Sequence, residues 1–303
     1  MLRTGTIFHG VYKINYEIKG DPKVSILIPN KDGLKYLKPC IKSILKLTTY
    51  KNYEIVIIEN NSEKKSTFRY YEKIKENPRI KILYYTEKEF NYSKIINYGV
   101  KNTTGEFVLQ LNNDTKVITK NWLEEFIGYA QQKEIGAVGA RLYYEDKSIQ
   151  HAGIAIGIAG TAGALLVNQE YGKHAYYGFE AITRNVSAVT GACLFTRRDI
   201  YEEVGYMNEE DFKVAFNDVD FCLKILEKGY RIVYNPYIEL FHFESKTRGY
   251  DELDPDKKKR FDKESIAFKN RWNILLSKPD KYYNRNFSRN KVDFSIEPEE
   301  IKF

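Results

Sequence analysis

Residues 24–30 have the sequence Val-Ser-Ile-Leu-Ile-Pro-Asn, an apolar run that stops at Pro29 and the polar Asn30. A short apolar run bounded by a proline is typical of a buried β-strand. Apolar residues then recur at helical spacing between Leu34 and Leu45. The stretch therefore predicts a strand followed by a helix, which is the repeating unit of an α/β sheet.

The same unit recurs along the first half of the chain. Three further strand patterns occupy residues 54–58, 80–84 and 107–111, and a helical pattern occupies residues 92–100. Strands that alternate with helices predict a Rossmann-like, mostly parallel central sheet with helices on both faces. Ligands bind such sheets beyond the carboxyl ends of the strands, and polar clusters follow several of these strands. The sequence thus predicts a ligand site at that edge.

The second half of the chain has a weaker pattern. Residues from about 150 to 185 are rich in Gly, Ala and Tyr and lack periodicity, which predicts a functional loop or flap. Gly191 lies inside a strand pattern, and its missing side chain indicates a close approach by backbone or ligand. The expected elements are a strand at 186–196, a helix at 218–228, short strands at 231–234 and 238–243, and a helical C-terminal extension at 257–276.

With 303 residues, the chain is long enough for one large domain. We expect a single α/β domain over residues 23–276. Its nucleotide-binding half would cover about residues 23–115, and its acceptor and catalytic half about residues 116–276. Residues 1–22 would form an N-terminal arm, and residues 277–303 a C-terminal tail packed on the domain.

The composition is that of a globular protein, because 43% of residues are hydrophobic and 29% are charged. No apolar run reaches the roughly 20 residues that span a bilayer, and residues 1–20 do not resemble a secretory signal. The sequence therefore predicts a cytoplasmic protein. The net charge of +7 is spread along the chain, which argues against a nucleic-acid partner. It is compatible with weak attraction to anionic donors or to the inner face of the cell membrane. The three cysteines lack metal-ligand spacing, and we expect no disulfide.

Two common nucleotide-binding motifs are missing from the sequence. No Gly-x-Gly-x-x-Gly follows the first strand and no Gly-Lys-Ser/Thr is present, so neither a dinucleotide enzyme nor a P-loop enzyme is indicated. Acids and a histidine gather instead at residues 112–114, 217–220 and 241–244. Glycosyl transfer from a nucleoside diphosphate needs a cation on the diphosphate, a base for the acceptor hydroxyl and a nucleoside pocket. These three segments contain side chains suited to such tasks.

From about Lys23 to Trp272 the sequence resembles glycosyltransferase family 2, whose members have the GT-A fold. It is similar in particular to bacterial enzymes of cell-surface polysaccharide assembly, among them rhamnosyltransferases. Several sequence blocks that occur in the family's order are far more specific evidence of membership than any single block. The blocks that carry the resemblance are residues 24–30, 57–62, 111–115, 190–193, 216–221 and 242–245.

The resemblance implies a divalent cation, Mn²⁺ or Mg²⁺, on the donor diphosphate. Asn112, Asn113 and Asp114 stand where the family has its Asp-x-Asp motif, and Asp114 supplies the remaining metal-binding carboxylate. Because Asn112 replaces the first acid, donor phosphates and His242 would complete the metal shell. The alternatives are that residues 112–115 form a turn and a helix cap before Trp122, and that His242 is a half-buried histidine bonded to the backbone.

The resemblance also implies that Asp218 is the general base. Its carboxylate would accept the acceptor proton while the sugar is attacked from the face opposite the leaving diphosphate, which inverts the configuration. The alternative is that Asp218 caps a helix, since carboxylates are favoured at helix N-termini. Asp220, two residues later, fits that alternative better.

The remaining site residues are expected to bind the donor. Glu59 would accept the N3–H of uracil or thymine, which favours UDP or dTDP over CDP, although Glu59 could equally cap the next turn. Asn91 could likewise simply start a helix, and the segment around Gly191 could be a bulge. By resemblance, the nucleoside and phosphates contact Pro29, Asn30, Glu59, Asn91, Asn112 and Asn113, and the sugar pocket is lined by Thr190, Gly191 and Ala192.

Together the motifs predict a metal-dependent, inverting glycosyltransferase that uses a nucleoside diphosphate sugar and a glycan or lipid-linked glycan acceptor. Two other functions stay open on the sequence. A sugar-phosphate nucleotidyltransferase usually has a Gly-rich, basic loop after the first strand, and the loop at residues 29–33 is poor in glycine. A non-catalytic glycan-binding domain would explain the missing acid at Asn112, but Asp114, Asp218 and His242 are all retained.

Overall fold

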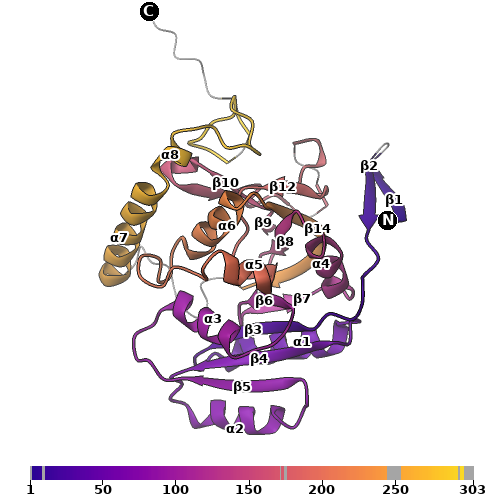
Figure 1. Ribbon diagram of the computed structural model, residues 1–303, viewed down its shortest axis with the longest axis vertical. Helices are drawn as coiled ribbons and strands as arrows, with labels where there is room; N and C mark the ends of the chain where they lie inside the picture. The colour runs from indigo at the N-terminus through magenta and orange to yellow at the C-terminus, as the bar shows by residue number, and fades with distance from the viewer. Residues whose placement is uncertain are drawn as a thin grey trace, which may run out of the picture.

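The computed structural model describes residues 2–8 by their backbone and residues 11–170, 172–173, 176–243, 254–292 and 294–296 in full. Figure 1 shows a central sheet with helices on either side and a two-stranded hairpin set apart at the N-terminal end. Within the described residues, no helix is both long and apolar enough to cross a membrane. The hairpin consists of β1 (Leu2–Phe8) and β2 (Val11–Asn15).

The first half confirms the predicted alternation of strands and helices. Its four strands are parallel, and each connection between consecutive strands contains a helix, as parallel pairing requires a crossover. The strands are β3 (Val24–Asn30), β4 (Tyr53–Asn60), β5 (Ile80–Tyr85) and β6 (Phe107–Leu111). The helices are α1 (Leu34–Leu47), α2 (Lys65–Ile74) and α3 (Tyr92–Lys101).

The two faces of these strands enter different apolar cores. Leu27 belongs to the cluster that contains Ile96 of α3, whereas Ile26 belongs to the cluster that contains Ile41 of α1. Burial on both faces explains why the strand at residues 24–28 is a continuous apolar run rather than an alternating one. Fully burying one such side chain contributes about 1.5–3 kcal/mol.

The second half extends the sheet with strands of both directions. β13 is antiparallel to its neighbours β6 and β8, whereas β14 is parallel to β8. The main path is β12-β14-β8-β13-β6-β3-β4-β5, with β7 paired to β14 and β9 paired to β8. These strands are β7 (Thr115–Val117), β8 (Ile135–Tyr143), β9 (Ile149–His151), β12 (Arg184–Val186), β13 (Cys193–Arg197) and β14 (Arg231–His242). The helices are α4 (Trp122–Ala130), α5 (Arg198–Glu203) and α6 (Asn217–Glu227).

Two strand predictions for this half are wrong in their bounds. The strand predicted at 186–196 is two strands, β12 and β13, separated by a turn that contains Gly191. The two short strands predicted at 231–234 and 238–243 are one strand, β14, whose pairing with β8 shifts register after Asn235. The segment predicted as a flap, residues 150–185, contains short paired strands, β10 (Ile154–Ile156) and β11 (Ala162–Ala164), and two 3₁₀ turns.

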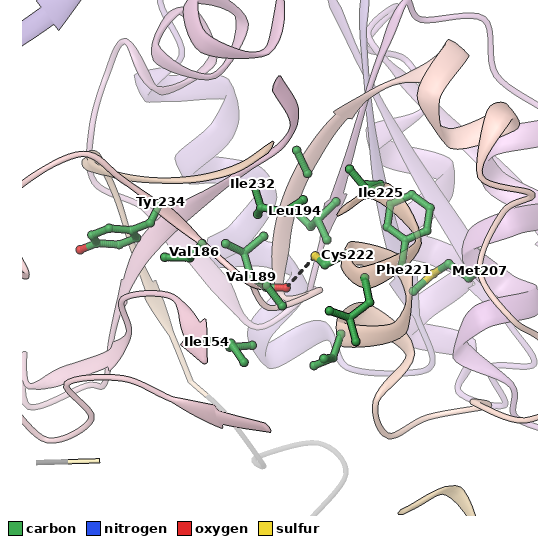
Figure 2. Close-up of a cluster of buried hydrophobic side chains, with 14 of the residues drawn as sticks. Ile154, Val186, Val189, Leu194, Met207, Phe221, Cys222, Ile225, Ile232 and Tyr234 are labelled. Carbon is green, nitrogen blue, oxygen red and sulfur yellow. Dashed lines mark hydrogen bonds between the residues drawn. The ribbon is translucent and has the colours of Figure 1, made fainter. Parts of the chain in front are cut away.

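The core under α6 fixes the helix that carries Asp218. Figure 2 shows Phe221, Cys222 and Ile225 of α6 among apolar side chains from the sheet, including Leu194 of β13. The Cys222 thiol donates a hydrogen bond to the Val189 carbonyl at 3.8 Å. α6 is thereby held against the strand edge where the ligand site is expected. All three cysteines are buried and free.

The C-terminal extension confirms the predicted helical pattern. It consists of α7 (Pro255–Arg271) and α8 (Asn273–Leu276), and α7 runs beside α6 at the left of Figure 1. Asp254 caps α7 by accepting hydrogen bonds from the backbone of Asp256 and Lys257. α7 is therefore a well-capped helix outside the sheet, and its contacts with the segment before α6 are described below.

Candidate active site

A cavity of about 620 Å³ opens at the carboxyl ends of the parallel strands. This is the edge where open α/β sheets bind ligands, and the volume is within the usual 300–1,000 Å³ of small-molecule sites. Most of the predicted site residues meet there, although they come from segments far apart in the sequence. The predicted residues that line the cavity are Pro29, Asn30, Asn112, Asn113, Asp114, Thr190, Gly191, Ala192, Asp218 and His242.

Asp114 and His242 form the pair suited to a cation. Asp114 follows β6 and His242 ends β14, and antiparallel pairing of β7 with β14 brings them together. The His242 Nε2 atom lies 3.2 Å from the Asp114 Oδ1 atom, and both residues are buried. Among the described residues, no cluster of three or more His, Cys, Asp or Glu side chains could hold a metal. Oxygen ligands from a bound diphosphate would therefore have to complete any metal shell.

Gln150 fixes the orientation of the His242 ring. The Gln150 Oε1 atom lies 2.6 Å from His242 Nδ1, and the Gln150 amide nitrogen donates to the His242 carbonyl at 3.3 Å. Because an amide oxygen only accepts, Nδ1 must carry the proton when the ring is neutral. The lone pair of Nε2 then accepts a hydrogen bond from the Asn112 side-chain amide, whose nitrogen lies 3.2 Å away. Nε2 also lies 3.2 Å from Asp114 Oδ1, which has no hydrogen-bond partner among the described residues. Nε2 and Asp114 Oδ1 are both acceptors, so a cation bound between them would replace the Asn112 hydrogen bond on Nε2.

We expect Gln150→Leu to weaken divalent-metal binding about 10–100-fold, the usual cost of losing a side chain that orients a metal ligand. Leucine keeps the bulk but cannot hold the Nδ1 proton, so the other tautomer would become accessible. Titration of Mn²⁺ in the presence of a nucleoside diphosphate measures the effect. Gln169→Leu is a matched control, since its amide donates to the Lys173 carbonyl and it does not line the cavity. Equal metal affinities for both variants and the unmodified chain would contradict this role of Gln150.

Asp218 lies in the first turn of α6 and lines the cavity. Its Oδ2 atom accepts a hydrogen bond from the Gly191 N–H at 2.8 Å, and its Oδ1 atom accepts one from the Val219 N–H at 2.8 Å. A Cβ atom at Gly191 would lie 3.3 Å from the Asp218 Cβ. The close approach indicated by Gly191 is therefore that of Asp218, and the glycine leaves room for it. Burial raises the pKa of the Asp218 carboxyl above its ordinary value, although the two backbone N–H groups lower it.

Asp220 faces the other way, into the packing between α6 and the C-terminal helices. Its Oδ1 atom lies 2.9 Å from Arg271 Nε and accepts a hydrogen bond from Trp272 Nε1 at 3.0 Å. It does not line the cavity. The capping alternative, which the sequence favoured for Asp220, gives way to an ion pair between its buried carboxylate and Arg271.

Glu59 lies behind the cavity wall rather than in it. The residue is 2% exposed, and its carboxylate accepts hydrogen bonds from the Tyr71 hydroxyl, the Ser62 hydroxyl and the Ser62 N–H. Tyr71 in turn accepts from Asn30 at 2.7 Å, and Asn30 accepts from Asn113 at 2.7 Å. A direct contact of Glu59 with a nucleoside base has no support in this geometry. Glu59 instead holds a network that ends at two cavity residues, Asn30 and Asn113.

We expect Glu59→Ala to lower the free energy of unfolding by about 1–3 kcal/mol, because it leaves buried donors on Tyr71 and Ser62 unpaired. Glu59→Gln is the matched control, since its amide oxygen still accepts one or two of these hydrogen bonds. Denaturant unfolding of both variants measures the difference. Unchanged stability of Glu59→Ala together with weaker nucleotide binding would return Glu59 to the base contact expected from the sequence.

Asn91 is also held outside the cavity. Its side chain caps α3 by accepting from the Lys94 N–H at 3.0 Å, and its amide donates to the Glu209 carbonyl at 2.8 Å. The alternative that Asn91 starts a helix therefore describes its position. It does not line the cavity, and the expected donor contact of Asn91 has no support in this geometry.

The sequence of this site matches a known family. A model of glycosyl transferase family 2 matches residues 25–205, more than half of the chain. The chain belongs to glycosyltransferase family 2. It is 39% identical over 288 residues to the uncharacterized protein y4gI of Sinorhizobium fredii, covering 94% of this chain and 31% of the relative. It is 34% identical over 286 residues to the O-antigen biosynthesis protein RfbC of Myxococcus xanthus, covering 94% of this chain and 22% of the relative. The chain thus spans less than a third of the length of these two relatives.

Solved structures confirm the GT-A fold of this family 2 chain. One is the mannosyltransferase PcManGT of Pyrobaculum calidifontis in complex with GDP-Man and Mn²⁺, with a TM-score of 0.59 and 16% identity, covering 88% of this chain and 72% of that chain. Another is GalNAc-T7 with UDP, GalNAc and Mn²⁺, with a TM-score of 0.59 and 17% identity, covering 77% of this chain and 45% of that chain. At this identity the likeness concerns the fold alone.

Several residues of this family 2 site were missed by the sequence analysis. Lys31 directly follows β3 and Lys88 lies shortly after β5. Their positions after strand ends could have identified them as cavity residues. Gln150 gave no signal, because its partner His242 is 92 residues away in the sequence. The cavity residues that were not predicted are Lys31, Asn60, Asn61, Lys88, Phe90, Tyr92, Val214, Asn217 and Lys257.

Proposed function

We propose that this domain is an inverting glycosyltransferase that transfers a sugar from a UDP- or dTDP-sugar to a glycan or lipid-linked glycan acceptor in bacterial surface polysaccharide assembly. The observation that carries the proposal is a single cavity that joins a cation-binding pair, Asp114 and His242, to a half-buried carboxylate, Asp218. The family and the name of the relative RfbC support the polysaccharide context. If this chain is part of a longer protein, the role in polysaccharide assembly is that of the longer protein.

The diphosphate of the donor would lie near Asp114 and His242. Mn²⁺ or Mg²⁺ bound between these ligands and the phosphates would neutralise the negative charge that develops on the leaving group. Lys31, Lys88 and Lys257 also line the cavity and add positive charge for an anionic ligand. Solved relatives of the fold contain Mn²⁺ together with UDP or GDP-Man, which supports a metal-bound nucleotide here.

Asp218 would accept the proton of the acceptor hydroxyl. As the acceptor oxygen forms a bond to the anomeric carbon, the bond from that carbon to the diphosphate oxygen breaks, and the proton passes to the Asp218 carboxylate. Attack from the face opposite the diphosphate gives inversion. The Gly191 and Val219 N–H groups hold the carboxylate in place for this step. Burial favours a base that takes up a proton more readily than an exposed aspartate.

Amide side chains would bind the nucleoside, since Glu59 does not line the cavity. Asn60 and Asn61 extend from the end of β4 into the cavity wall, and Phe90 lies at the same opening. The Asn61 side-chain nitrogen donates to Asn60 Oδ1 at 3.2 Å and to the Glu87 carbonyl at 2.7 Å. The Asn60 amide nitrogen and the Asn61 Oδ1 atom would therefore be the groups that pair with O4 and N3–H of uracil or thymine. This chemistry replaces the contact that was expected from Glu59.

A panel of UDP-, dTDP-, CDP- and GDP-sugars tests the proposal, with Mn²⁺ present and release of nucleoside diphosphate as the measurement. We expect turnover with a UDP- or dTDP-sugar and slower turnover with the others. A nucleotidyltransferase would instead release pyrophosphate from a nucleoside triphosphate and a sugar phosphate. Binding of glycans without turnover of any donor would favour a non-catalytic domain.

A further inference from the structure

We propose that Glu264 of α7 is a positioning residue for Asp218, and that it acts by fixing the loop of residues 212–216 that leads into α6. The inference rests on the proposed role of Asp218 as the base. The contacts between α7 and this loop lie in residues 206–276, outside the part of the chain that matches the family model. The C-terminal helical extension would thus belong to the catalytic machinery rather than only cover the domain.

Glu264 points inward from a helix whose other acids face solvent. It is 3% exposed, whereas Asp256 and Asp262 of the same helix are exposed. Its Oε2 atom accepts hydrogen bonds from the Ala215 N–H at 2.5 Å and from the Val214 N–H at 3.4 Å. Two successive backbone N–H groups directed at one carboxylate are a strong, charge-assisted arrangement. Glu264 therefore fixes the loop two to three residues before α6 begins.

Phe216, the last residue before α6, has a backbone conformation that needs such support. Its φ is +58°, in the left-handed region that a bulky non-glycine residue rarely adopts. Its ring stacks on the ring of Phe268, with 4.9 Å between the ring centroids, and packs against the ring of Phe261, with 5.4 Å between the centroids. Both partners belong to α7. Unfavourable backbone conformations persist only where the surroundings over-determine them. Here α7 supplies those surroundings through Glu264 and two aromatic rings.

The opposite side of the loop is held by the start of α3. The Lys213 carbonyl accepts from the Tyr92 N–H at 2.7 Å, and the Phe212 carbonyl accepts from the Ser93 hydroxyl at 2.6 Å. The loop is therefore fixed between α3, whose Tyr92 lines the donor cavity, and α7. Asp218 follows this loop directly. A shift of the loop would move the carboxylate relative to both the donor and the acceptor.

The test compares Glu264→Leu with Glu264→Gln. Leucine has a similar size but cannot accept the two hydrogen bonds, whereas glutamine still offers one acceptor oxygen. We expect Glu264→Leu to lower the saturated transfer rate about 10–100-fold, the scale of a displacement of about 1 Å at a reacting group. Donor affinity should fall much less than the rate, because Asp114 and His242 are untouched and Val214 is the loop residue that lines the cavity. Glu264→Gln should recover most of the rate. Asp262→Leu, which removes an exposed acid from α7, is the matched control and should be unchanged.

A double-mutant cycle with Asp218→Asn tests whether Glu264 affects transfer through Asp218. We expect Glu264→Leu to reduce transfer much less when Asp218 is already Asn, because the group that it positions is gone. Equal fold-losses in both backgrounds, or a wild-type rate for Glu264→Leu, would overturn the proposal. If Glu264→Leu does not fold, the same cycle is run with Glu264→Gln. Its smaller loss of transfer rate should then disappear when Asp218 is already Asn, and a loss that persists there would overturn the proposal. Failure of the proposed function is seen separately, as a normal transfer rate in Asp218→Asn alone.

Discussion

Replacing Asp218 by asparagine should lower sugar transfer about 10²–10⁴-fold, the usual contribution of a general base. Asparagine keeps the size of the side chain, and its amide oxygen can still accept from the Gly191 or the Val219 N–H. It cannot take up a proton. The fold and the affinity for the donor should therefore be retained while the transfer step is lost. Transfer with saturating acceptor, alongside thermal unfolding and donor titration, measures all three.

The competing explanation of Asp218 predicts a different result. If Asp218 only caps α6, asparagine would replace it with a loss of a few tenths of a kcal/mol and near-normal transfer. Asp220→Asn is the matched control, because Asp220 pairs with Arg271 and Trp272 and does not line the cavity. We expect that variant to lose stability rather than the chemical step.

The pH dependence of transfer gives independent information on the same residue. Burial raises the pKa of Asp218, and a base must be deprotonated to work. Transfer should therefore fall as the pH drops through this raised pKa, at a higher pH than an ordinary aspartate would give. The residual activity of Asp218→Asn should not show this fall of the transfer rate at low pH.

Removing divalent cations should lower transfer by at least about 10²-fold, because a cation supplies several kcal/mol of charge stabilisation to a leaving diphosphate. The physical basis is the pair Asp114 and His242, which offers one carboxylate and one imidazole, with no third acidic ligand beside them in the described part of the chain. Activity should return on addition of Mn²⁺ or Mg²⁺ after EDTA is removed. Asp114→Asn should need a much higher metal concentration for half-maximal activity. Full turnover in EDTA, with negligible bound metal, would contradict metal dependence.

The first half of the fold was predictable because its signals are local. The strand at residues 24–28 and the helix after Leu34 have continuous or periodic apolar patterns that match burial on two faces. β13 was not predicted with its correct bounds, because its place between β6 and β8 depends on pairings far away in the sequence. Gly191 marked a close approach, but the sequence could not say that the approaching residue was Asp218.

The site was predictable where a motif lies at a strand or helix end. Asp114, Asp218 and His242 were found in this way, and the structure brings them to one cavity. Glu59 occupies a family position but turns toward Tyr71 and Ser62. Side-chain direction at such a position depends on neighbours from another element, which a motif does not encode. Gln150 was missed for the same reason.

Calorimetric titration of UDP and dTDP, with Mn²⁺ and then with EDTA, tests most directly whether this cavity is a metal–nucleotide site. The unmodified chain and Asp114→Asn are compared in both conditions. We predict tight binding of at least one nucleotide to the unmodified chain with Mn²⁺, and weak binding both in EDTA and to Asp114→Asn. Binding that is equally tight with and without metal, or unaffected by Asp114→Asn, would contradict the assignment of Asp114 and His242 as the cation pair.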